Sequence, residues 1–321
     1  MEAFRFGIMG AGSIAVKFCE AVSLIPGCEV AAVASKSAER AERFAGNNRI
    51  RAYYDSYERM LAEERPDCVY LAVTPDDHYR LSMLCLEHGI PVLCEKAMFL
   101  NSSQAEAVFD LSKEKGIFVM EAMWSRFLPA VRKAKEWLEE GRIGRLSFAE
   151  LAIGFLAPAD ASSRYLNPAL GGGAAFDVTV YAYELADFFL DQPVEEMTVA
   201  AVWGPTGVDL TDHVTLRCRD CAAALTGSFA AGLEERAVLY GERGKIVVPH
   251  PHYASEAFLY PADGGESLHF RDQQTRNGFV YEIREVMDCI RAGKRESTVV
   301  PHSLTLNCAR MFDRIMETKR L

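Results

Sequence analysis

A glycine-rich turn follows the first apolar segment of the chain. Residues 4–9 read Phe-Arg-Phe-Gly-Ile-Met and residues 10–15 read Gly-Ala-Gly-Ser-Ile-Ala, which predicts a short strand running into a G-x-G-x-x-A loop. Glycine takes backbone angles that other residues avoid, so the main chain of such a loop approaches a pyrophosphate at the positive N-terminus of the next helix. We expect the following residues to contact a nucleotide: Gly10, Ala11, Gly12, Ser13 and Ile14.

The residues around this loop supply the context that the short string lacks. Glycine and alanine are common, so the string alone also occurs in ordinary turns. Here Ile14, Phe18 and Val22 follow at helical spacing, Pro-Gly at residues 26–27 ends the helix, and residues 30–34 form a second apolar strand. Strand, loop, helix and strand together occupy about 30 residues, as a dinucleotide fingerprint requires.

The residues after the second strand bear on which dinucleotide is bound. An NAD site usually places Asp or Glu there to hold the ribose 2′-hydroxyl, whereas this chain has Ser35, Lys36 and Ser37, with Arg40 one helical turn further on. A carboxylate would repel a 2′-phosphate, and a hydroxyl with cations would bind it. We therefore expect NADP(H) rather than NAD(H), held by Ser35, Lys36 and Arg40. The alternatives are that Lys36 and Arg40 begin a solvated helix, and that Glu39 contacts the ribose.

Composition limits the class of protein. The chain has 321 residues, of which 50% are hydrophobic, so it can bury a large core in about two domains. Its net charge of −10 argues against nucleic acid or an anionic membrane as a partner. It has no apolar run of the ~18 residues that span a bilayer and no basic-then-apolar N-terminal signal. We expect a soluble, cytoplasmic protein whose nine cysteines are reduced thiols.

Strand and helix patterns alternate up to about residue 122. Beyond the first unit, strand patterns cover residues 53–54, 68–73, 92–95 and 118–122, and helix patterns cover residues 55–64, 78–88 and 102–115. Such alternation predicts an α/β domain with a doubly wound parallel Rossmann sheet covered by helices on both faces. Ligands of such sheets lie beyond the carboxyl ends of the strands. Four expected cofactor contacts follow the fourth and fifth strands: Thr74, Pro75, Glu95 and Lys96.

The pattern changes after a helix at residues 128–141. A strand at residues 146–155, a long loop and a helix at residues 177–190 come first, and two helices at residues 281–291 and 303–319 come last. Between them strand patterns cover residues 198–203, 213–218, 222–229, 237–240, 245–248 and 257–260. Consecutive strands with short turns predict an α+β domain with an open, mostly antiparallel sheet.

We accordingly expect an NAD(P)-binding domain at residues 1–122 and a substrate-binding and oligomerisation domain at residues 123–321. An apolar outer face of the second sheet would join the subunits of a homodimer or homotetramer.

Four motifs together resemble the Gfo/Idh/MocA oxidoreductases. They are the glycine loop, Thr-Pro-Asp-Asp-His at residues 74–78, Val-Leu-Cys-Glu-Lys at residues 92–96, and Gly-Gly-Gly at residues 171–173 followed by Asp177. The first three occur in the order and spacing typical of the family's nucleotide domain, and the last lies in the second domain. The resemblance implies a Rossmann fold, a nicotinamide cofactor and hydride transfer.

Two further segments narrow the resemblance. Residues 121–129, Glu-Ala-Met-Trp-Ser-Arg-Phe-Leu-Pro, resemble the corresponding segment of dimeric dihydrodiol dehydrogenases and NADP-dependent D-xylose dehydrogenases. Many relatives carry D-x-x-x-H in the second domain, whereas this chain has Asp177 and Tyr181. One departure is Ala97, where the family usually has a proline that is often cis. The replacement of this proline leaves open whether the Lys96–Ala97 bond is cis and how precisely Lys96 is placed for activity.

The resemblance and the chemistry of alcohol oxidation assign catalytic roles to three residues. Hydride leaves carbon for the nicotinamide while a base takes the hydroxyl proton, and carbonyl reduction runs the same steps in reverse. A phenol with a pKa near 10 serves as that base only if a neighbouring cation favours phenolate. We expect Tyr181 to be the general acid/base, Lys96 the cation, and Asp177 a group that orients the lysine or binds a substrate hydroxyl. The alternative is that Tyr181 is a core residue of an amphipathic helix.

Other polar and aromatic residues are candidates for the cofactor or substrate. Trp124 follows the last strand of the nucleotide domain and should approach both nicotinamide and substrate. Arg126 could hold a phosphate or a substrate oxygen, or could form a salt bridge instead. Phe155 and Arg164, with Tyr165 and Trp203, are candidate pocket walls.

The histidines are expected to have no metal-binding role. His78 should pack near the cofactor. His213, His250 and His252 lack carboxylate or cysteine partners at metal-ligand spacing, so we expect no metal.

The sequence thus favours an NADP-dependent oxidoreductase acting on the CH–OH group of a vicinal diol or cyclic sugar. A second possibility is a reductase of a ketosugar or dicarbonyl compound. A third, of another class, is a non-catalytic nicotinamide-binding sensor. Retention of Lys96, Asp177 and Tyr181 argues against a sensor, because a binding protein needs no proton-transfer pair.

Overall fold

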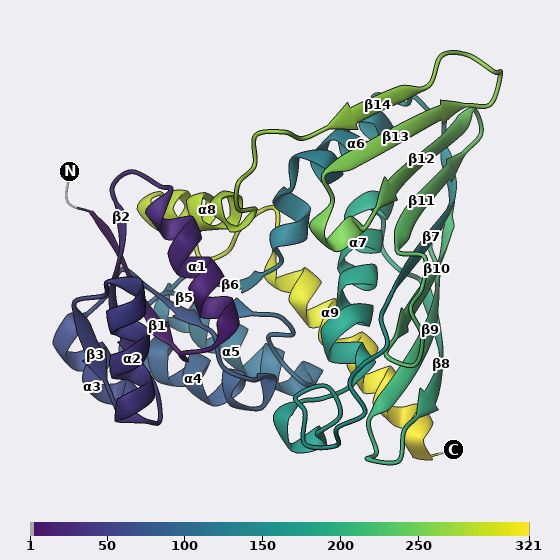
Figure 1. Cartoon of the computed structure of the whole chain (residues 1–321). Coiled ribbons are helices and arrows are strands. Elements are labelled where there is room, and N and C mark those ends of the chain that lie inside the picture. Colours follow the sequence, from purple (N-terminus) through teal and green to yellow (C-terminus); the bar gives the residue numbers. More distant parts are fainter. Residues whose placement is uncertain (1–2, 321) are drawn as a thin grey trace. The chain divides into compact units, whose positions relative to one another are not determined.

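The structure is a computed structural model that describes residues 3–320. The chain divides into two compact units (Figure 1). The first comprises Met1–Ala122 and Asn277–Ala309, and the second comprises Met123–Arg276 and Arg310–Leu321. The boundary near the C-terminus falls within one long helix, α9 (His302–Glu317).

The first unit contains a parallel sheet. Within residues 3–320 its six strands are β1 (Phe4–Met9), β2 (Cys28–Ala34), β3 (Ala52–Tyr54), β4 (Cys68–Leu71), β5 (Val92–Glu95) and β6 (Val119–Ala122). Their order is β3-β2-β1-β4-β5-β6, and every pair is parallel. This is the doubly wound order of a dinucleotide-binding sheet, which confirms the predicted fold.

Helices connect these strands and pack on the sheet. They are α1 (Ser13–Ser23), α2 (Ala38–Asn48), α3 (Tyr57–Glu64), α4 (Pro75–Glu87) and α5 (Ser102–Lys115), joined from later in the chain by α8 (Phe279–Arg291). The core includes Phe18 of α1, whose ring stacks on that of Tyr70 at 3.8 Å between centroids. The amide of Asn277 ties α8 to α1 by donating to the carbonyl oxygen of Lys17 at 2.8 Å.

The second unit contains a larger, mixed sheet. Within the described residues its strands are β7 (Leu146–Gly154), β8 (Glu196–Trp203), β9 (Asp209–Arg217), β10 (Ala222–Ser228), β11 (Arg236–Gly241), β12 (Gly244–Pro249), β13 (Glu256–Pro261) and β14 (Leu268–Arg271). Their order is β14-β13-β12-β11-β7-β10-β9-β8. All pairs are antiparallel except β10 with β7. The predicted open, mostly antiparallel sheet is therefore confirmed.

Helices cover one face of this second sheet (Figure 1). α7 (Val180–Leu190) packs on β7 and β10, and α6 (Pro129–Glu139) packs on β12 and β13. Short helical turns complete the unit: η1 (Trp124–Phe127), η2 (Pro168–Leu170), η3 (Ala175–Thr179), η4 (Pro251–Tyr253) and η5 (Thr318–Arg320). η3 is a π-helical turn that leads directly into α7.

Two features of this unit differ from the sequence prediction. β14 is an additional strand, whose alternating polar side chains gave no apolar run. β9 begins at Asp209, four residues before the expected start at His213. The sequence did not predict this extension, because the buried Asp209 and Asp212 interrupt the alternation of apolar residues. Among residues 3–320, no helix combines the length and hydropathy needed to cross a membrane.

Candidate active site

The glycine loop joins the end of β1 to the start of α1. Gly10 has a φ of 107°, where a side chain is strained, and a Cβ there would collide with the carbonyl oxygen of Ala72. Gly12 is the N-cap of α1 and offers no side chain to bond the first N–H groups of the helix. Ser13 and Ile14 begin that helix, so the free N–H groups of its first turn can bind a phosphate.

Lys36, at the end of β2, is held by an acidic residue of α4. Its Nζ lies 2.5 Å from Asp77 Oδ2, and Arg80 Nε donates to the other oxygen at 3.0 Å. The hydrogen bond with Asp77 raises the pKa of Lys36. Burial alone would raise the pKa of Asp77, but hydrogen bonds from Lys36 and Arg80 outweigh it and lower that pKa.

The neighbours of Lys36 are placed differently. Ser35 is buried and Arg40 is exposed. Of the two cations expected to bind a 2′-phosphate, Lys36 is therefore already paired with the Asp77 carboxylate.

The side chain of His78 contacts the main chain of the loops that follow β4 and β5. Thr74 is the N-cap of α4 and Pro75 its first residue, which places His78 in the first turn. The ring is fully buried, with Nδ1 2.9 Å from the carbonyl oxygen of Ala97 and Nε2 3.1 Å from that of Val73. Burial lowers the pKa of His78 despite these carbonyl contacts, so the ring is neutral at physiological pH. The structure thus links the Thr-Pro-Asp-Asp-His motif to the residue that follows Lys96.

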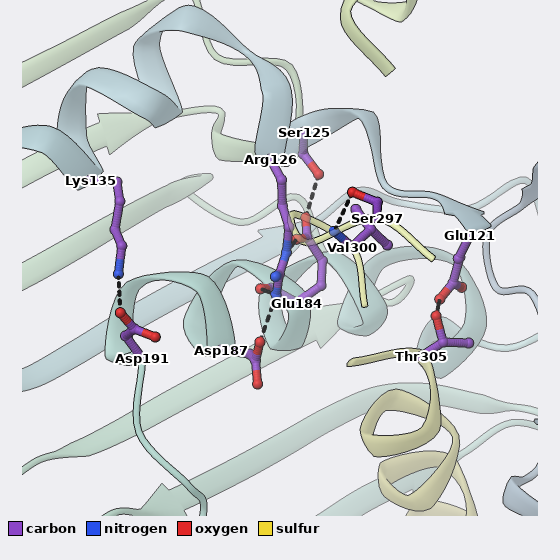
Figure 2. Close-up of polar contacts among 10 residues, drawn as sticks. All are labelled: Glu121, Ser125, Arg126, Lys135, Glu184, Asp187, Asp191, Ser297, Val300 and Thr305. Atoms are coloured by element: carbon purple, nitrogen blue, oxygen red, sulfur yellow. Dashed lines mark hydrogen bonds and ion pairs between the residues drawn. The ribbon is translucent and has the colours of Figure 1, made fainter. Parts of the chain in front are cut away.

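The segment around Lys96 is tied to two further carboxylates. Lys96 is half-buried, and its bond to Ala97 is cis. Glu95 accepts a hydrogen bond from the Tyr70 hydroxyl. Glu121 Oε1 accepts the N–H of Met98 at 2.7 Å. Its Oε2 accepts the hydroxyl of Thr305 at 2.7 Å (Figure 2). Glu121 therefore fixes the backbone just beyond Lys96.

Tyr181 lies in the first turn of α7 among side chains from two other elements. The residue is 7% exposed, and its phenol oxygen accepts the indole N–H of Trp124 at 2.9 Å. The imidazole of His252, from η4, lies 5.2 Å from the Tyr181 ring between centroids. An N–H donor stabilises negative charge on the phenol oxygen, so this arrangement suits a tyrosine that gives up and regains a proton.

Asp177 lies on the π-helical turn η3, which comes directly before the helix that carries Tyr181. Its Oδ1 lies 3.3 Å from Arg164 Nη1, and the Arg164 guanidinium lies over the Tyr165 ring at 4.1 Å. The Tyr165 ring in turn lies 5.4 Å from that of Phe155. Asp177, Arg164 and Phe155 thus belong to one chain of contacts in the second unit. Trp203 is separate from it, since its indole donates to Thr318 at 3.2 Å.

Arg126 is engaged in a buried network. Its Nε donates to Glu184 Oε2 at 2.8 Å and its Nη2 to Asp187 Oδ2 at 2.8 Å, while Ser125 donates to Glu184 (Figure 2). Burial raises the pKa of Glu184 to about 7, although the charge of Arg126 opposes the rise. Arg126 therefore forms the salt bridge that the sequence offered as an alternative to ligand binding. The network also attaches η1, the turn that contains Trp124, to α7.

Sequence reasoning overlooked three residues of these groups. His252 was considered only as a metal ligand, Asp77 only as part of a motif, and Glu121 only as part of a resemblance. Among residues 3–320, no three His, Cys, Asp or Glu side chains gather as metal ligands would. The proximity of His252 to Tyr181 depends on the path of the chain through five strands, which no local pattern predicts.

Two family models match the chain. Residues 4–123 match the oxidoreductase family with an NAD-binding Rossmann fold, and residues 131–247 match the GFO/IDH/MocA C-terminal domain. Among curated proteins, trans-1,2-dihydrobenzene-1,2-diol dehydrogenase of Mus musculus is 32% identical over 311 residues, covering 93% of this chain and 92% of the relative. The Homo sapiens enzyme of that name is 29% identical, covering 94% and 92%.

Solved structures share the fold at lower identity. Aldose-aldose oxidoreductase from Caulobacter crescentus superposes with a TM-score of 0.89 at 20% identity, covering 99% of this chain and 98% of the other. A levoglucosan dehydrogenase in complex with NADH and levoglucosan gives 0.89 at 18% identity, with the same coverage. A 3-ketoreductase from Actinomadura kijaniata with bound NADP gives 0.87 at 23% identity, covering 99% and 98%.

Proposed function

Because the chain belongs to the Gfo/Idh/MocA family of NAD(P)-binding oxidoreductases, we propose that it oxidises the CH–OH group of a vicinal diol or a cyclic sugar. The curated relatives support the diol, since they are named for a dihydrobenzene diol as substrate. The names of two neighbours in fold specify sugars. The reverse reaction, reduction of a ketosugar or dicarbonyl compound, would use the same residues.

The glycine loop fits a dinucleotide. Gly10 brings the main chain against Ala72 with no room for a Cβ, and the first turn of α1 presents N–H groups to an anion. When bound, the nicotinamide accepts or donates the hydride. The protein's own contribution is to hold the cofactor and to move the proton.

We propose NADP(H) as the preferred cofactor. Ser35, Lys36 and Arg40 follow β2, where a 2′-phosphate would lie, and this position lacks the carboxylate typical of NAD sites. Asp77 reduces the expected preference for NADP(H) over NAD(H), because it already pairs with Lys36. In this proposal, Lys36 exchanges Asp77 for the phosphate when the cofactor binds.

We assign the proton transfer to Tyr181. The phenol accepts the proton of the substrate hydroxyl as the hydride leaves carbon, and returns it in the reverse direction. The indole N–H of Trp124, 2.9 Å from the phenol oxygen, supports this role because it stabilises the phenolate. We assign Lys96 as the cation that assists Tyr181, and Asp177 as a group that orients a substrate hydroxyl. The contact between Trp124 and Tyr181 is the observation that carries the proposal.

Replacement of Tyr181 by phenylalanine tests it. Loss of the proton-transfer group should lower kcat by about 1,000-fold, within the usual range for general acid–base catalysis. NADPH formation is measured by absorbance over a panel of vicinal diols and aldoses, and cofactor affinity by titration. Tyr183→Phe is the control, since Tyr183 lies on the same helix and is also buried. Turnover by Tyr181→Phe at the wild-type rate would refute the assignment.

We propose that the two units of the chain have different functions. The unit that contains residues 1–122 binds the dinucleotide, and the unit that contains most of residues 123–321 binds the substrate and joins subunits through the open sheet. Exposed aromatic side chains of one cross-strand row support the interface: Phe148 on β7, Tyr240 on β11 and Tyr260 on β13, with Lys245 of β12 between the two tyrosines. Large apolar side chains on an exposed sheet face are typical of a buried contact. A mass measured by light scattering that corresponds to a monomer at micromolar concentration would contradict it.

A further inference from the structure

Two aspartates of β9 are buried in the second unit. Asp209 and Asp212 are both 0% exposed. Buried carboxylates are costly unless they are paired or hydrogen-bonded. Neither residue had a role in the functional prediction, and neither belongs to the contacts of Tyr181 described above.

Each aspartate binds one end of the π-helical turn η3. Asp209 Oδ2 accepts the N–H of Ala175, the first residue of η3, at 2.6 Å. Asp212 Oδ2 accepts the hydroxyl of Thr179, the last residue of η3, at 2.8 Å. Asp177 lies between these two points. The two carboxyl groups therefore hold the turn at both of its ends.

Two glycines make room for these contacts. A Cβ on Gly173, whose φ is 133°, would collide with Asp209 Oδ1. A Cβ on Gly227, which pairs with Asp212 across the sheet, would collide with the hydroxyl of Thr179. The third glycine of the Gly-Gly-Gly motif thus allows Asp209 to reach the main chain of η3.

The remaining two oxygens of the pair lack any conventional donor. Among residues 3–320, Asp209 Oδ1 and Asp212 Oδ1 are buried and make no hydrogen bond of ordinary distance and angle. Burial and the charge of Asp209 raise the pKa of Asp212 well above its usual value. Burial also raises the pKa of Asp209, although the N–H of Ala175 opposes the rise. The two carboxyl groups interact with each other through their side chains. One proton held between them, with Asp212 as donor and Asp209 as acceptor, would satisfy both atoms.

We propose that Asp209 and Asp212 share one proton and together act as positioning residues that clamp η3, and so set the orientation of Asp177 and Tyr181. Neither aspartate touches the reacting atoms in this proposal. The part concerning Tyr181 rests on the proposed function. The clamp itself does not, because it concerns only the contacts of η3.

Three substitutions separate the clamp from a general effect on stability. Asp212→Asn keeps a donor toward Asp209 and an acceptor for Thr179, so its kcat should stay within about threefold of wild type. Asp209→Ala and Thr179→Val each release one end of η3. Because small displacements at a reacting centre can cost about 100-fold, their kcat should fall by about that factor, with cofactor affinity unchanged. Thr211→Ala is the control, since Thr211 bonds Ser228 on the same sheet and should retain wild-type kcat.

Hydrogen–deuterium exchange of residues 174–181 provides a readout independent of turnover. Asp209→Ala and Thr179→Val should accelerate exchange in this segment, and Asp212→Asn should not. If Asp209→Ala does not fold, Thr179→Val and Asp212→Asn carry the test. The clamp is refuted if Asp212→Asn loses as much activity as the releasing variants, or if those variants keep wild-type kcat and exchange. If Tyr181→Phe proves fully active, the proposed function fails, while the exchange measurement still decides the clamp.

Discussion

The glycine loop of the first unit offers main-chain groups to a ligand, whereas the contacts around Tyr181 in the second unit are made by side chains. At the glycine loop, a positive φ and a helix N-terminus present backbone N–H groups. Around Tyr181, the contacts are an indole and an imidazole from distant parts of the sequence. A main-chain site depends on local backbone geometry. A side-chain site depends on how distant elements are packed together.

This difference implies that the two sites fail in different ways. A substitution in the glycine loop should weaken cofactor binding and leave the proton-transfer group in place. A substitution around Tyr181 should slow the chemical step and leave cofactor affinity intact. Kinetic and binding measurements on matched variants can therefore separate the contributions of the two units.

The largest effect on cofactor affinity is expected at Gly10. In Gly10→Ala, strain at a φ of 107° and collision with Ala72 displace the loop, so the Kd for NADP(H) should rise about 30-fold or more. Fluorescence titration measures the change. Gly27→Ala is the matched control, because Gly27 has a φ of 72° but a Cβ there meets nothing within 4 Å. It should lower Tm without changing Kd, and an equal loss of affinity in both variants would contradict the argument.

In the second unit, the corresponding variant is Trp124→Phe. It removes the N–H that bonds the Tyr181 oxygen, and loss of a hydrogen bond to a developing charge corresponds to about a tenfold fall in kcat. Cofactor affinity should change far less than kcat. Trp137→Phe, a buried tryptophan of α6, controls for the loss of indole volume. Equal kcat values for Trp124→Phe and wild type would remove the main support for Tyr181 as the acid/base.

The main-chain site is also the more predictable of the two from sequence. The glycine spacing, the strand before it and the helix after it predict the loop, because each signal is local. The same holds for the strand order, which follows from alternating elements and the preferred handedness of their connections. The sequence alone could not reveal that Asp77 would pair with Lys36, since they come from different strand–helix junctions.

The side-chain site was predictable only in part. Asp177 and Tyr181 lie on one helical segment, so their spacing is visible in the sequence. His252 is near Tyr181 only because η4 is brought there by the strands that precede it. The strand expected at residues 213–218 did not include Asp209 and Asp212, because polar residues interrupt an apolar strand pattern. Their burial is satisfied by contacts with η3, which the strand's own sequence cannot indicate.

A smaller effect should distinguish the two cofactors at the first unit. Asp77→Asn removes a negative charge beside Lys36. Because the lysine is exposed, we take the value of a surface ion pair, up to about 1 kcal/mol, or about fivefold in affinity. The Kd for NADP(H) should therefore fall by up to that factor, with little change for NAD(H). Asp76→Asn is the control for net charge, since Asp76 is its exposed neighbour. Titration at low salt is required, and equal shifts for both cofactors would argue against the pairing as the cause.

The smallest effect concerns the network that anchors α7. The folded-state pKa of Glu184 is raised from 4.5 to about 7, so the folded protein binds more protons than the unfolded chain between these values. This group's contribution to stability is therefore present at low pH and lost as pH rises through about 7, by about 1 kcal/mol between pH 6 and pH 8. Other titrating groups add to the observed profile, so the informative quantity is the difference from Glu184→Gln, which does not titrate. Its amide oxygen can still accept from Arg126, and its NH2 group can donate to the Ser125 hydroxyl. Thermal unfolding at both pH values should show that wild type gains more than the variant on acidification. A parallel pH dependence in the two proteins would mean that Glu184 is already charged at pH 6, held so by Arg126.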